Sequence, residues 1–278
     1  MKKILVPIDF SEHSEYALEV AANMAKKKKS EILLLHMLGL SEAVLTKDES
    51  QEFAEAQYYM KLAKKRFGLF LNRPWLKGIK ITEMVQNYKI FSEINNVAKE
   101  ENIDLIIMGS HGTGGLSEIF VGSNTEKVVR SSEVPVLVIK KRIPDFRMEK
   151  AVFGFDFKVE NVSAYRKAVQ FLASMNVEVH VIYVNQPGIN FMSSSQIQSQ
   201  IDVFLGVAHH GNLPDYIRMN QVSDYTVETG VYNYAKKIKA DTIAVTTHGR
   251  SGLAHFFKGS IGEDMANHAS LPVITFKI

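Results

Sequence analysis

The stretch Gly109-Ser110-His111-Gly112-Thr113-Gly114-Gly115-Leu116-Ser117-Glu118-Ile119-Phe120-Val121-Gly122-Ser123 directly follows an apolar run, Ile103 to Met108. A strand end, a glycine-rich loop and a new helix start are typical of a chain that presents backbone N–H groups to phosphate. A strand-to-helix connection usually has about two to six residues, so this long loop suggests a function. The alternative is a flexible connection in which Ser123 only caps the next helix.

The glycine spacing fits neither of two well-known phosphate loops. No Gly-Lys-Ser or Gly-Lys-Thr follows, so the loop is not a Walker motif. The glycines also do not follow the Gly-x-Gly-x-x-Gly spacing of dinucleotide folds. The loop therefore predicts phosphate binding of another kind.

The loop recurs in altered form near the C-terminus, and the repeat decides the domain count. Thr246-Thr247-His248-Gly249 follows an apolar run, and Gly259-Ser260 follows ten residues after Gly249, as Gly122-Ser123 follows Gly112. Two further segments repeat in order: Lys3 to Phe10 matches Lys150 to Phe157, and Glu133 to Ile139 matches Ser270 to Phe276. We predict a tandem duplication with domains at 1–142 and 148–278, joined by the charged, proline-containing linker around Lys140 to Asp145.

Composition fits two packed domains and excludes some chemistry. The chain has 278 residues, 46% hydrophobic and 23% charged, with no cysteine and a net charge of +3. The absence of cysteine excludes thiol catalysis and disulfides. Pro7 and Asp9 interrupt the apolar N-terminus too early for a signal peptide, and no segment is apolar for the length of a membrane span. We expect a cytoplasmic protein that binds neither membrane nor nucleic acid.

The densest basic run is Lys26 to Lys29, after a helical pattern. A solvated helix C-terminus is favoured there by the helix dipole. A phosphate or nucleic-acid patch is the less favoured alternative. The run therefore supports no nucleic-acid function by itself.

Strands and helices alternate through the first half. We predict strands at 3–8, 31–38, 79–85, 103–108 and 136–139, and helices at 14–27, 42–70, 91–101 and 123–131. Unbroken apolar strands separated by helices indicate a parallel sheet buried on both faces. The predicted fold class is α/β, with two tandem doubly wound sheets, in which ligands bind beyond the carboxyl ends of the strands.

Asp9 and its repeat Asp156 each follow a strand at that edge. A carboxylate there can accept hydrogen bonds from ribose hydroxyls or a purine amino group. It can equally cap the next helix, together with Ser11 and Ser14 in the first half. The sequence alone leaves both roles open.

Catalytic and metal signatures are weak. The chain has no Gly-x-Ser-x-Gly elbow and no His-Glu-x-x-His motif. His111 and His248 could act as general acids near phosphate, but such residues more often fix loop geometry. The adjacent His209 and His210 point in different directions on a helix or strand, so we predict no metal site.

The pattern Gly109-x2-Gly112-x9-Gly122-Ser123, with Val6-Pro7-Ile8-Asp9 at the first strand and Glu133 to Val138 at the last, resembles the universal stress protein family. The whole chain is similar to its tandem-domain, UspA-like members. The resemblance implies an adenine nucleotide alpha hydrolase-like, Rossmann-like fold with a five-stranded parallel sheet in each domain. It also implies ATP binding, because members with this glycine motif bind ATP.

The resemblance assigns roles to twelve residues of the first half. Asp9 would contact adenosine, in a pocket shaped by Pro7 and Ile8 and flanked by Met37 and Met108. The remaining residues would line the ribose and phosphates: Gly109, His111, Gly112, Gly122, Ser123, Asn124 and Thr125. Mg²⁺ would be held chiefly by the phosphates, since it commonly keeps its waters.

The second half departs from this pattern. Thr246 replaces the first glycine, Gly154 replaces the proline, and Gly262 stands where the first copy has Thr125. A Cβ at Thr246 would narrow the approach of a ligand. A second site is therefore the less favoured interpretation, built on Asp156, His248, Gly249, Gly259 and Ser260.

Three functions compete at this point. The favoured one is a regulatory ATP-binding stress protein whose second half acts as a pseudo-dimer partner. The others are a scaffold protein without nucleotide affinity, and an enzyme, either a slow ATPase or one acting on another small ligand. Similar single-domain proteins associate through their last strands, so we expect internal pairing of 136–139 with 273–276 and leave further homo-oligomers open.

Overall fold

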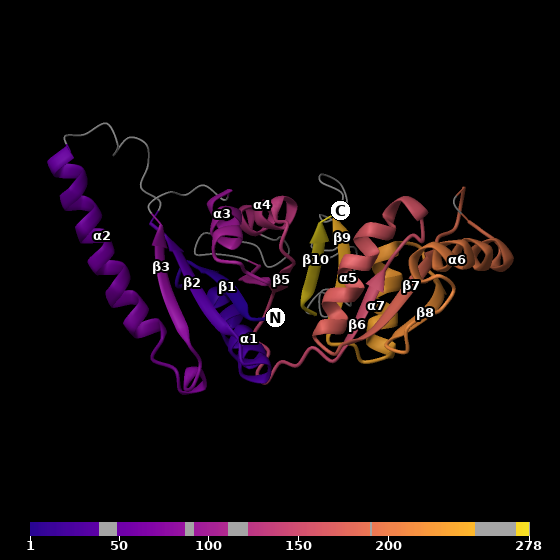
Figure 1. Cartoon of the computed structure of the whole chain (residues 1–278), viewed down its shortest axis with the longest axis horizontal. Helices are drawn as coiled ribbons and strands as arrows, with labels where there is room; N and C mark the ends of the chain where they lie inside the picture. The colour runs from indigo at the N-terminus through magenta and orange to yellow at the C-terminus, as the bar shows by residue number, and fades with distance from the viewer. Residues whose placement is uncertain (39–48, 87–91, 111–121, 190, 248–270, 278) are drawn as a thin grey trace. The chain divides into compact units, whose positions relative to one another are not determined.

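The computed structural model describes residues 1–38, 49–86, 92–110, 122–189, 191–247 and 271–277. The chain forms two compact units, Met1–Phe146 and Arg147–Ile278. The predicted sites at His111, Gly112, His248, Gly249, Gly259 and Ser260 lie outside the described residues. Each unit is an α/β domain built on five parallel strands (Figure 1).

The first unit is built on five parallel strands in the order β3-β2-β1-β4-β5. Their bounds are β1 Lys3–Ile8, β2 Glu31–Met37, β3 Ile81–Gln86, β4 Leu105–Gly109 and β5 Val136–Ile139. The helical segments are α1 Glu12–Lys28, α2 Glu49–Phe70, η1 Pro74–Leu76, α3 Ser92–Glu100 and α4 Ser123–Ser131. Strand β4 is buried along its whole length, as expected inside a parallel sheet covered on both faces, and β5, the last strand in this order, is buried as well.

Helix α1 shows how local sequence fixes an element. The side chain of Ser11 accepts a hydrogen bond from the N–H of Ser14 and so caps the helix start. Lys29 ends the helix in the left-handed conformation, after three lysines that complement the helix dipole. The small apolar face between these ends packs against β1 and β4. The helix is therefore held close to the strands that border the candidate site.

The second unit repeats this topology with the strand order β10-β9-β6-β7-β8. Its strands are β6 Lys150–Gly154, β7 Glu178–Asn185, β8 Ile217–Ser223, β9 Thr242–Thr247 and β10 Val273–Lys277. Its helical segments are η2 Val159–Asn161, α5 Val162–Ser174, α6 Ser194–His209 and α7 Val227–Lys237. Two doubly wound, five-stranded parallel sheets confirm the predicted fold class.

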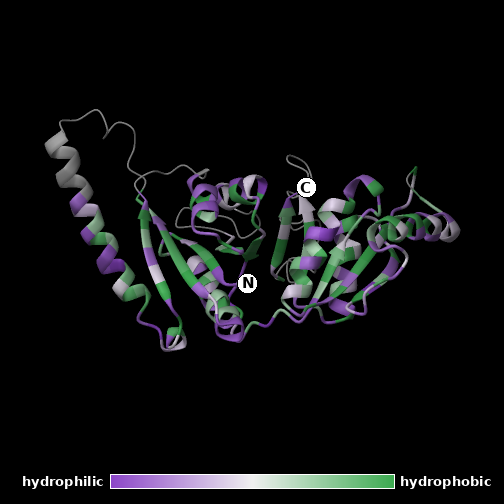
Figure 2. Cartoon of the chain, viewed as in Figure 1, coloured by the Kyte–Doolittle hydropathy of each residue, from purple (hydrophilic) through white to green (hydrophobic). Residues whose placement is uncertain are grey.

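Hydropathy follows the same plan in both units. Figure 2 shows the central strands mainly in hydrophobic colours and the helices striped with hydrophilic residues. Every helix that the structure describes is too short or too polar to cross a membrane.

Several predicted bounds agree with the structure and others shift by a few residues. The helix at 123–131 and the strand at 136–139 are confirmed. The helix predicted from Ser14 starts at Glu12, because Ser11 rather than a later residue is the cap. The strand predicted at 79–85 begins at Ile81, because the N–H of Ile79 donates to the carbonyl of Leu76 and extends the turn after η1. No pattern in the sequence predicted η1.

Candidate functional site

The candidate site lies where the strand order of the first unit reverses, between β1 and β4. In doubly wound sheets, ligands bind at this point beyond the carboxyl ends of the strands. Asp9 follows the last residue of β1, and Gly109 is the last residue of β4. The sequence-predicted residues of these two strands therefore lie at one edge of one sheet.

Asp9 belongs to a tight turn that joins β1 to α1. Its Oδ1 accepts a hydrogen bond of 3.0 Å from the N–H of Ser11. Phe10, between them, has a φ of 64°, which is uncommon for a bulky residue. Its ring packs against His36, Phe67 and Phe70, and this burial holds the unusual backbone in place. The turn orients the Asp9 carboxylate at the start of α1.

His36 supports this turn from β2. Its Nδ1 lies 2.9 Å from the carbonyl oxygen of Ile8, which can only accept, so Nδ1 carries the proton. Burial lowers the pKa of His36, while the Ile8 carbonyl and the charge of Asp9 act in the opposite direction. The neutral ring thus ties the end of β2 to the end of β1. Its part in the site gave no signal in the sequence.

Gly109 is the point at which two helix N-termini meet the sheet. A Cβ on Gly109 would lie 2.7 Å from the carbonyl oxygen of His13 and 2.8 Å from its Cβ, so only glycine lets α1 approach this closely. On the other side, the buried hydroxyl of Thr125 donates to the carbonyl of Gly109 over 2.8 Å. We expected the hydroxyl of Thr125 to lie against a phosphate. It donates to the Gly109 carbonyl instead, and so attaches α4 to β4.

The two ends of the glycine-rich loop are joined by the backbone. The N–H of Gly122 donates to the carbonyl of Ser110 over 2.7 Å, and the N–H of Ser110 donates to Ile139 in β5 over 2.9 Å. Helix α4 then begins with Gly122 as a cap that makes no side-chain hydrogen bond to the first turn. The first N–H groups of a helix lack intrahelical acceptors, and such an uncapped start suits an anion. Ser123 and Asn124 are exposed there.

The other predicted residues occupy positions consistent with this edge. Ile8 and Met108 are buried near the strand ends, and Pro7 and Met37 are half-buried. Within the predicted set, the hydroxyl of Thr125 donates to the carbonyl of Gly109, and the hydroxyl of Ser123 lies 3.5 Å from the side-chain oxygen of Asn124. Among the described residues, no group of three or more His, Asp and Glu side chains could hold a metal ion.

The matching edge of the second unit is arranged differently. Asp156 accepts hydrogen bonds from the amide of Asn161 on both oxygens, at 3.1 and 3.0 Å, and from the N–H of Lys158 at 3.2 Å. The segment that corresponds to the first turn of α1 is the short helix η2. Thr246 stands where the first unit has Gly109, and its Cβ is incompatible with the close helix approach seen there. The carboxylate of Asp156 is thus engaged within its own turn.

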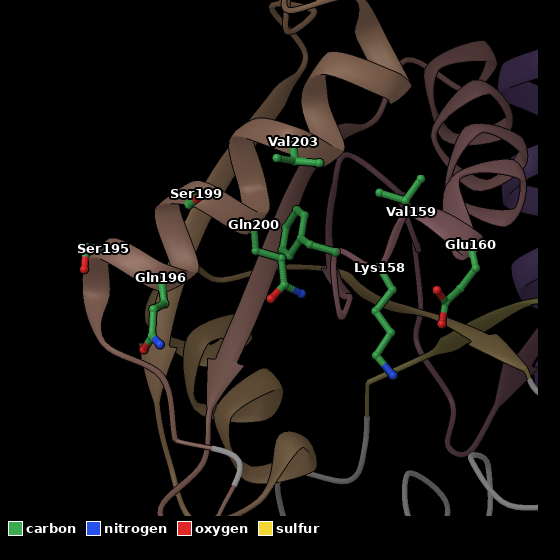
Figure 3. Close-up of a pocket in the computed structure, with 9 residues that line it drawn as sticks. Lys158, Val159, Glu160, Ser195, Gln196, Ser199, Gln200 and Val203 are labelled. Atoms are coloured by element: carbon green, nitrogen blue, oxygen red, sulfur yellow. The ribbon is translucent and has the colours of Figure 1, made fainter.

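A groove of about 730 Å³ opens beside that turn, between the start of η2 and α6 (Figure 3). Its lining consists of Phe157, Lys158, Val159, Glu160, Ser195, Gln196, Ser199, Gln200 and Val203. Gln200 donates to the carbonyl of Asp156 over 2.7 Å, and Gln196 belongs to the capping box of α6. Both amides therefore already stabilise the fold, and the groove does not reproduce the site of the first unit.

Comparison with known proteins identifies the repeated domain. The universal stress protein family model matches residues 1–140 and again 148–277. A universal stress protein of Methanocaldococcus jannaschii is 35% identical over 155 residues, which cover 51% of this chain and 96% of that protein. A universal stress protein of Synechocystis is 22% identical over 311 residues and covers the full length of both chains.

A solved structure is similar in fold along nearly the whole chain. The crystal structure of a universal stress protein from Archaeoglobus fulgidus aligns with a TM-score of 0.61 at 21% identity. The alignment covers 99% of this chain and 96% of that one. At this identity the likeness supports the fold, while the ligand has to be argued from the site.

Proposed function

The chain belongs to the universal stress protein family, with two copies of the family domain, and from this premise we propose that its first domain binds ATP as a regulatory ligand. The observation that carries the proposal is the uncapped start of α4, attached to β4 at Gly109 and placed at the edge that also holds Asp9. Helix N–H groups suit phosphate oxygens, and a carboxylate suits ribose hydroxyls. The edge thus offers complementary groups for both ends of a nucleotide.

We assign the parts of ATP to residues as follows. The phosphates lie at the first turn of α4, near Ser123 and Asn124, and Asp9 accepts from the adenosine part. Magnesium accompanies the phosphates. The predicted contributions of Pro7, Ile8, Met37, Met108, His111 and Gly112 belong to this proposal and follow from the family resemblance.

The second domain is proposed to be a divergent partner of the first. In it the carboxylate of Asp156 is already hydrogen-bonded to Asn161, so ribose hydroxyls would have to displace an internal partner. Losing a satisfied hydrogen bond offsets what a new one gains. We therefore expect one nucleotide per chain.

A binding role is favoured over catalysis by the side chains of this edge. Hydrolysis needs a group that orients the attacking water. Asp9 accepts from Ser11 within its turn, and His36 donates to Ile8 within the sheet. These two titratable side chains have structural hydrogen bonds, so we expect at most slow turnover.

Calorimetric titration of nucleotide-stripped protein with Mg–ATP tests the proposal. We expect about one site per chain in the wild type. Asp9→Asn keeps an oxygen that can accept from Ser11 but removes the charge, so we expect affinity to fall by roughly tenfold or more, since hydrogen bonds to charged groups contribute about 1.5–3 kcal/mol. Asp156→Asn is the matched control in the second unit and should bind as the wild type does.

Two outcomes would reject parts of the proposal. No binding at millimolar ATP would favour the scaffold interpretation. Equal loss in both variants would place a nucleotide in the second unit as well. Phosphate release measured with saturating Mg–ATP then separates a binding protein from an ATPase.

A further inference from the structure

Two large apolar side chains project into solvent from the connection between β7 and α6. Ile189 is fully exposed and Phe191 is 63% exposed, and we call these two residues the finger. The base of the connection is fixed, because the side-chain amide of buried Asn185 donates to the carbonyl of Met192 over 2.9 Å and accepts from its N–H over 3.1 Å. The N–H of Phe191 also donates to the carbonyl of Gly188 over 3.1 Å. The fold therefore presents these two side chains instead of burying them.

The finger lies next to the groove between η2 and α6. Phe191 is three residues before Ser194, the first residue of α6, and so lies within about 11 Å of the helix start. The groove runs along that helix, and Figure 3 shows Val203 on its α6 wall and Val159 on its η2 wall. These valines are 59% and 45% exposed. Exposed apolar side chains that are rimmed by polar ones mark an interaction site.

Charge is absent from the stretch that forms the finger and one wall of the groove. No Asp, Glu, Lys or Arg occurs from Asn185 to Ile201, although such residues make up 23% of the chain. The α6 wall consists of Ser, Gln and Val side chains, namely Ser195, Gln196, Ser199, Gln200 and Val203. Depletion of charge together with exposed aromatic groups is typical of the core of a protein interface. We therefore expect a partner with an uncharged surface, which nucleic acids and anionic membranes do not offer.

A second copy of this chain has such a surface. Serine hydroxyls and glutamine amides can both donate and accept, so the α6 wall can hydrogen-bond to its own copy. Juxtaposed like charges oppose association, and this wall brings none to a two-fold axis. The charged groups of the η2 wall, Lys158 and Glu160, are of opposite sign. The finger supplies an apolar projection, and the groove supplies an apolar recess to receive it.

We propose that this surface is a homodimer interface, in which the finger of each chain inserts into the groove between η2 and α6 of a second copy. A two-fold axis that passes between finger and groove makes the contact self-complementary, since the same residues serve both chains. Both parts of the interface belong to the second unit. The proposal is independent of nucleotide binding in the first unit.

Sedimentation velocity of the full chain over a concentration series tests the interface. The wild type should dimerise, and Ile189→Ser/Phe191→Ser should raise the dimer dissociation constant by about tenfold or more, because a few anchoring apolar side chains dominate interfaces. Tyr58→Ser, at a 64% exposed tyrosine of the first unit, is the matched control and should dimerise as the wild type does. A monomeric wild type, or a finger variant that dimerises normally, overturns the proposal.

A mixing experiment tests whether the finger meets the groove or another finger. Val203→Glu places a charge in the groove, so it should weaken self-association as the finger variant does. An equimolar mixture of the two variants should form a heterodimer, because the intact finger of one then meets the intact groove of the other. Thermal unfolding should match the wild type in both variants, since all three substituted side chains are exposed. No recovery in the mixture of folded variants overturns the pairing of finger with groove.

Cross-linking tests the same contact directly, and the absence of native cysteine makes single-site labelling simple. Phe191→Cys mixed with Val203→Cys should be joined by a short bis-maleimide, because the proposed contact brings these positions together between chains. Phe191→Cys mixed with Leu69→Cys is the matched control, since Leu69 is 66% exposed and lies in the first unit. A yield with Val203→Cys that is no higher than the yield with Leu69→Cys overturns the proposal.

Discussion

Gly109 concentrates several requirements of the candidate site in one residue. Its missing side chain lets the carbonyl of His13 come close, and its own carbonyl receives the hydroxyl of Thr125. Gly109 ends β4 and is not among the glycines with positive φ, so the space it leaves for a helix, and not its backbone conformation, requires a glycine here. Any side chain at position 109 would fill the space that α1 needs. The close packing at Gly109 therefore allows both α1 and α4 to reach this edge of the sheet.

Gly109→Ala should destabilise the first unit by about 1–3 kcal/mol, because the added Cβ meets backbone atoms that cannot move aside. The chain has one tryptophan, Trp75 in η1, so urea unfolding followed by its fluorescence reports on this unit. Gly68→Ala is the matched control, since a Cβ at Gly68 within α2 meets nothing within 4 Å. It should be stabilising by about 0.5–1 kcal/mol. Equal effects of the two changes would contradict the packing role of Gly109.

His36 should make the first unit less stable on acidification. Burial lowers its pKa in the folded state, so below the unfolded value of about 6.5 the unfolded chain takes up the proton first. Its contribution to stability is complete above that pH and is lost as the pH falls toward the folded pKa. NMR titration of the ring should give a pKa below about 6.5. His36→Gln should reduce the change in unfolding free energy between pH 7.5 and 5.5, and a ring pKa above the unfolded value would contradict this account.

At the scale of elements, α4 combines a stabilising and a binding role that can be separated. Its first turn has no side-chain cap, so a negative group there is favoured by the helix dipole. The same turn is the proposed location of the phosphates. A carboxylate fixed at this turn would therefore stabilise the unliganded protein and weaken the binding of phosphate.

Ser123→Asp should raise the stability of the unliganded first unit by about 0.3–1 kcal/mol and weaken ATP binding by several-fold. The opposite signs follow from one cause, because the carboxylate takes the place that a phosphate would occupy. Urea unfolding and calorimetric titration of the same sample measure both effects. Ser123→Ala, which adds no charge, should leave affinity less affected; equal loss in the two variants would point to the hydroxyl instead.

Element bounds could be predicted from sequence wherever the signal is local. The run from Ser123 to Ser131 and the strand Val136–Ile139 carry clear periodicity, and both match the structure. The sequence did not predict η1, or the left-handed backbone at Phe10, because the buried cluster that holds Phe10 comes from α2 and β2. The carboxyl edge of the sheet was expected to bind the ligand from the alternation of strands and helices, whereas the strand order comes from the structure. The hydrogen bonds from Asn161 to Asp156 could not be predicted from sequence, because they depend on where η2 places Asn161.

At the scale of the whole molecule, the two copies of the domain differ in the side chains at the carboxyl ends of their strands. Asp9 accepts from the backbone N–H of Ser11. Asp156 accepts from the backbone N–H of Lys158 and, on both oxygens, from the side-chain amide of Asn161. Sequence repeats predicted two similar domains, and altered residues such as Thr246 predicted that they differ. The structure adds how they differ, namely in the hydrogen bonds that the two aspartates accept.

ATP should protect the two units unequally from hydrogen exchange. We expect slower exchange in peptides that cover Ser11 to Tyr16 and Ser123 to Ser131, because the ligand occupies the adjoining edge. Peptides covering β6 and η2 should be unchanged. Mass spectrometry with and without Mg–ATP measures this, and Asp9→Asn should abolish the difference. Protection around η2 in the wild type would contradict a single site.

The closure between Ser110 and Gly122 has a consequence for protein engineering. Because the hydrogen bond from Gly122 and the attachment of Thr125 hold both ends of the loop, the fold fixes where the intervening chain leaves and returns. The entropy of closing a flexible segment grows only with the logarithm of its length, about 0.6 kcal/mol for each doubling. A reporter domain inserted into the intervening chain would thus join the fold at the hydrogen-bonded pair Ser110 and Gly122, so that the ATP binding proposed above could be read out by a genetically encoded sensor.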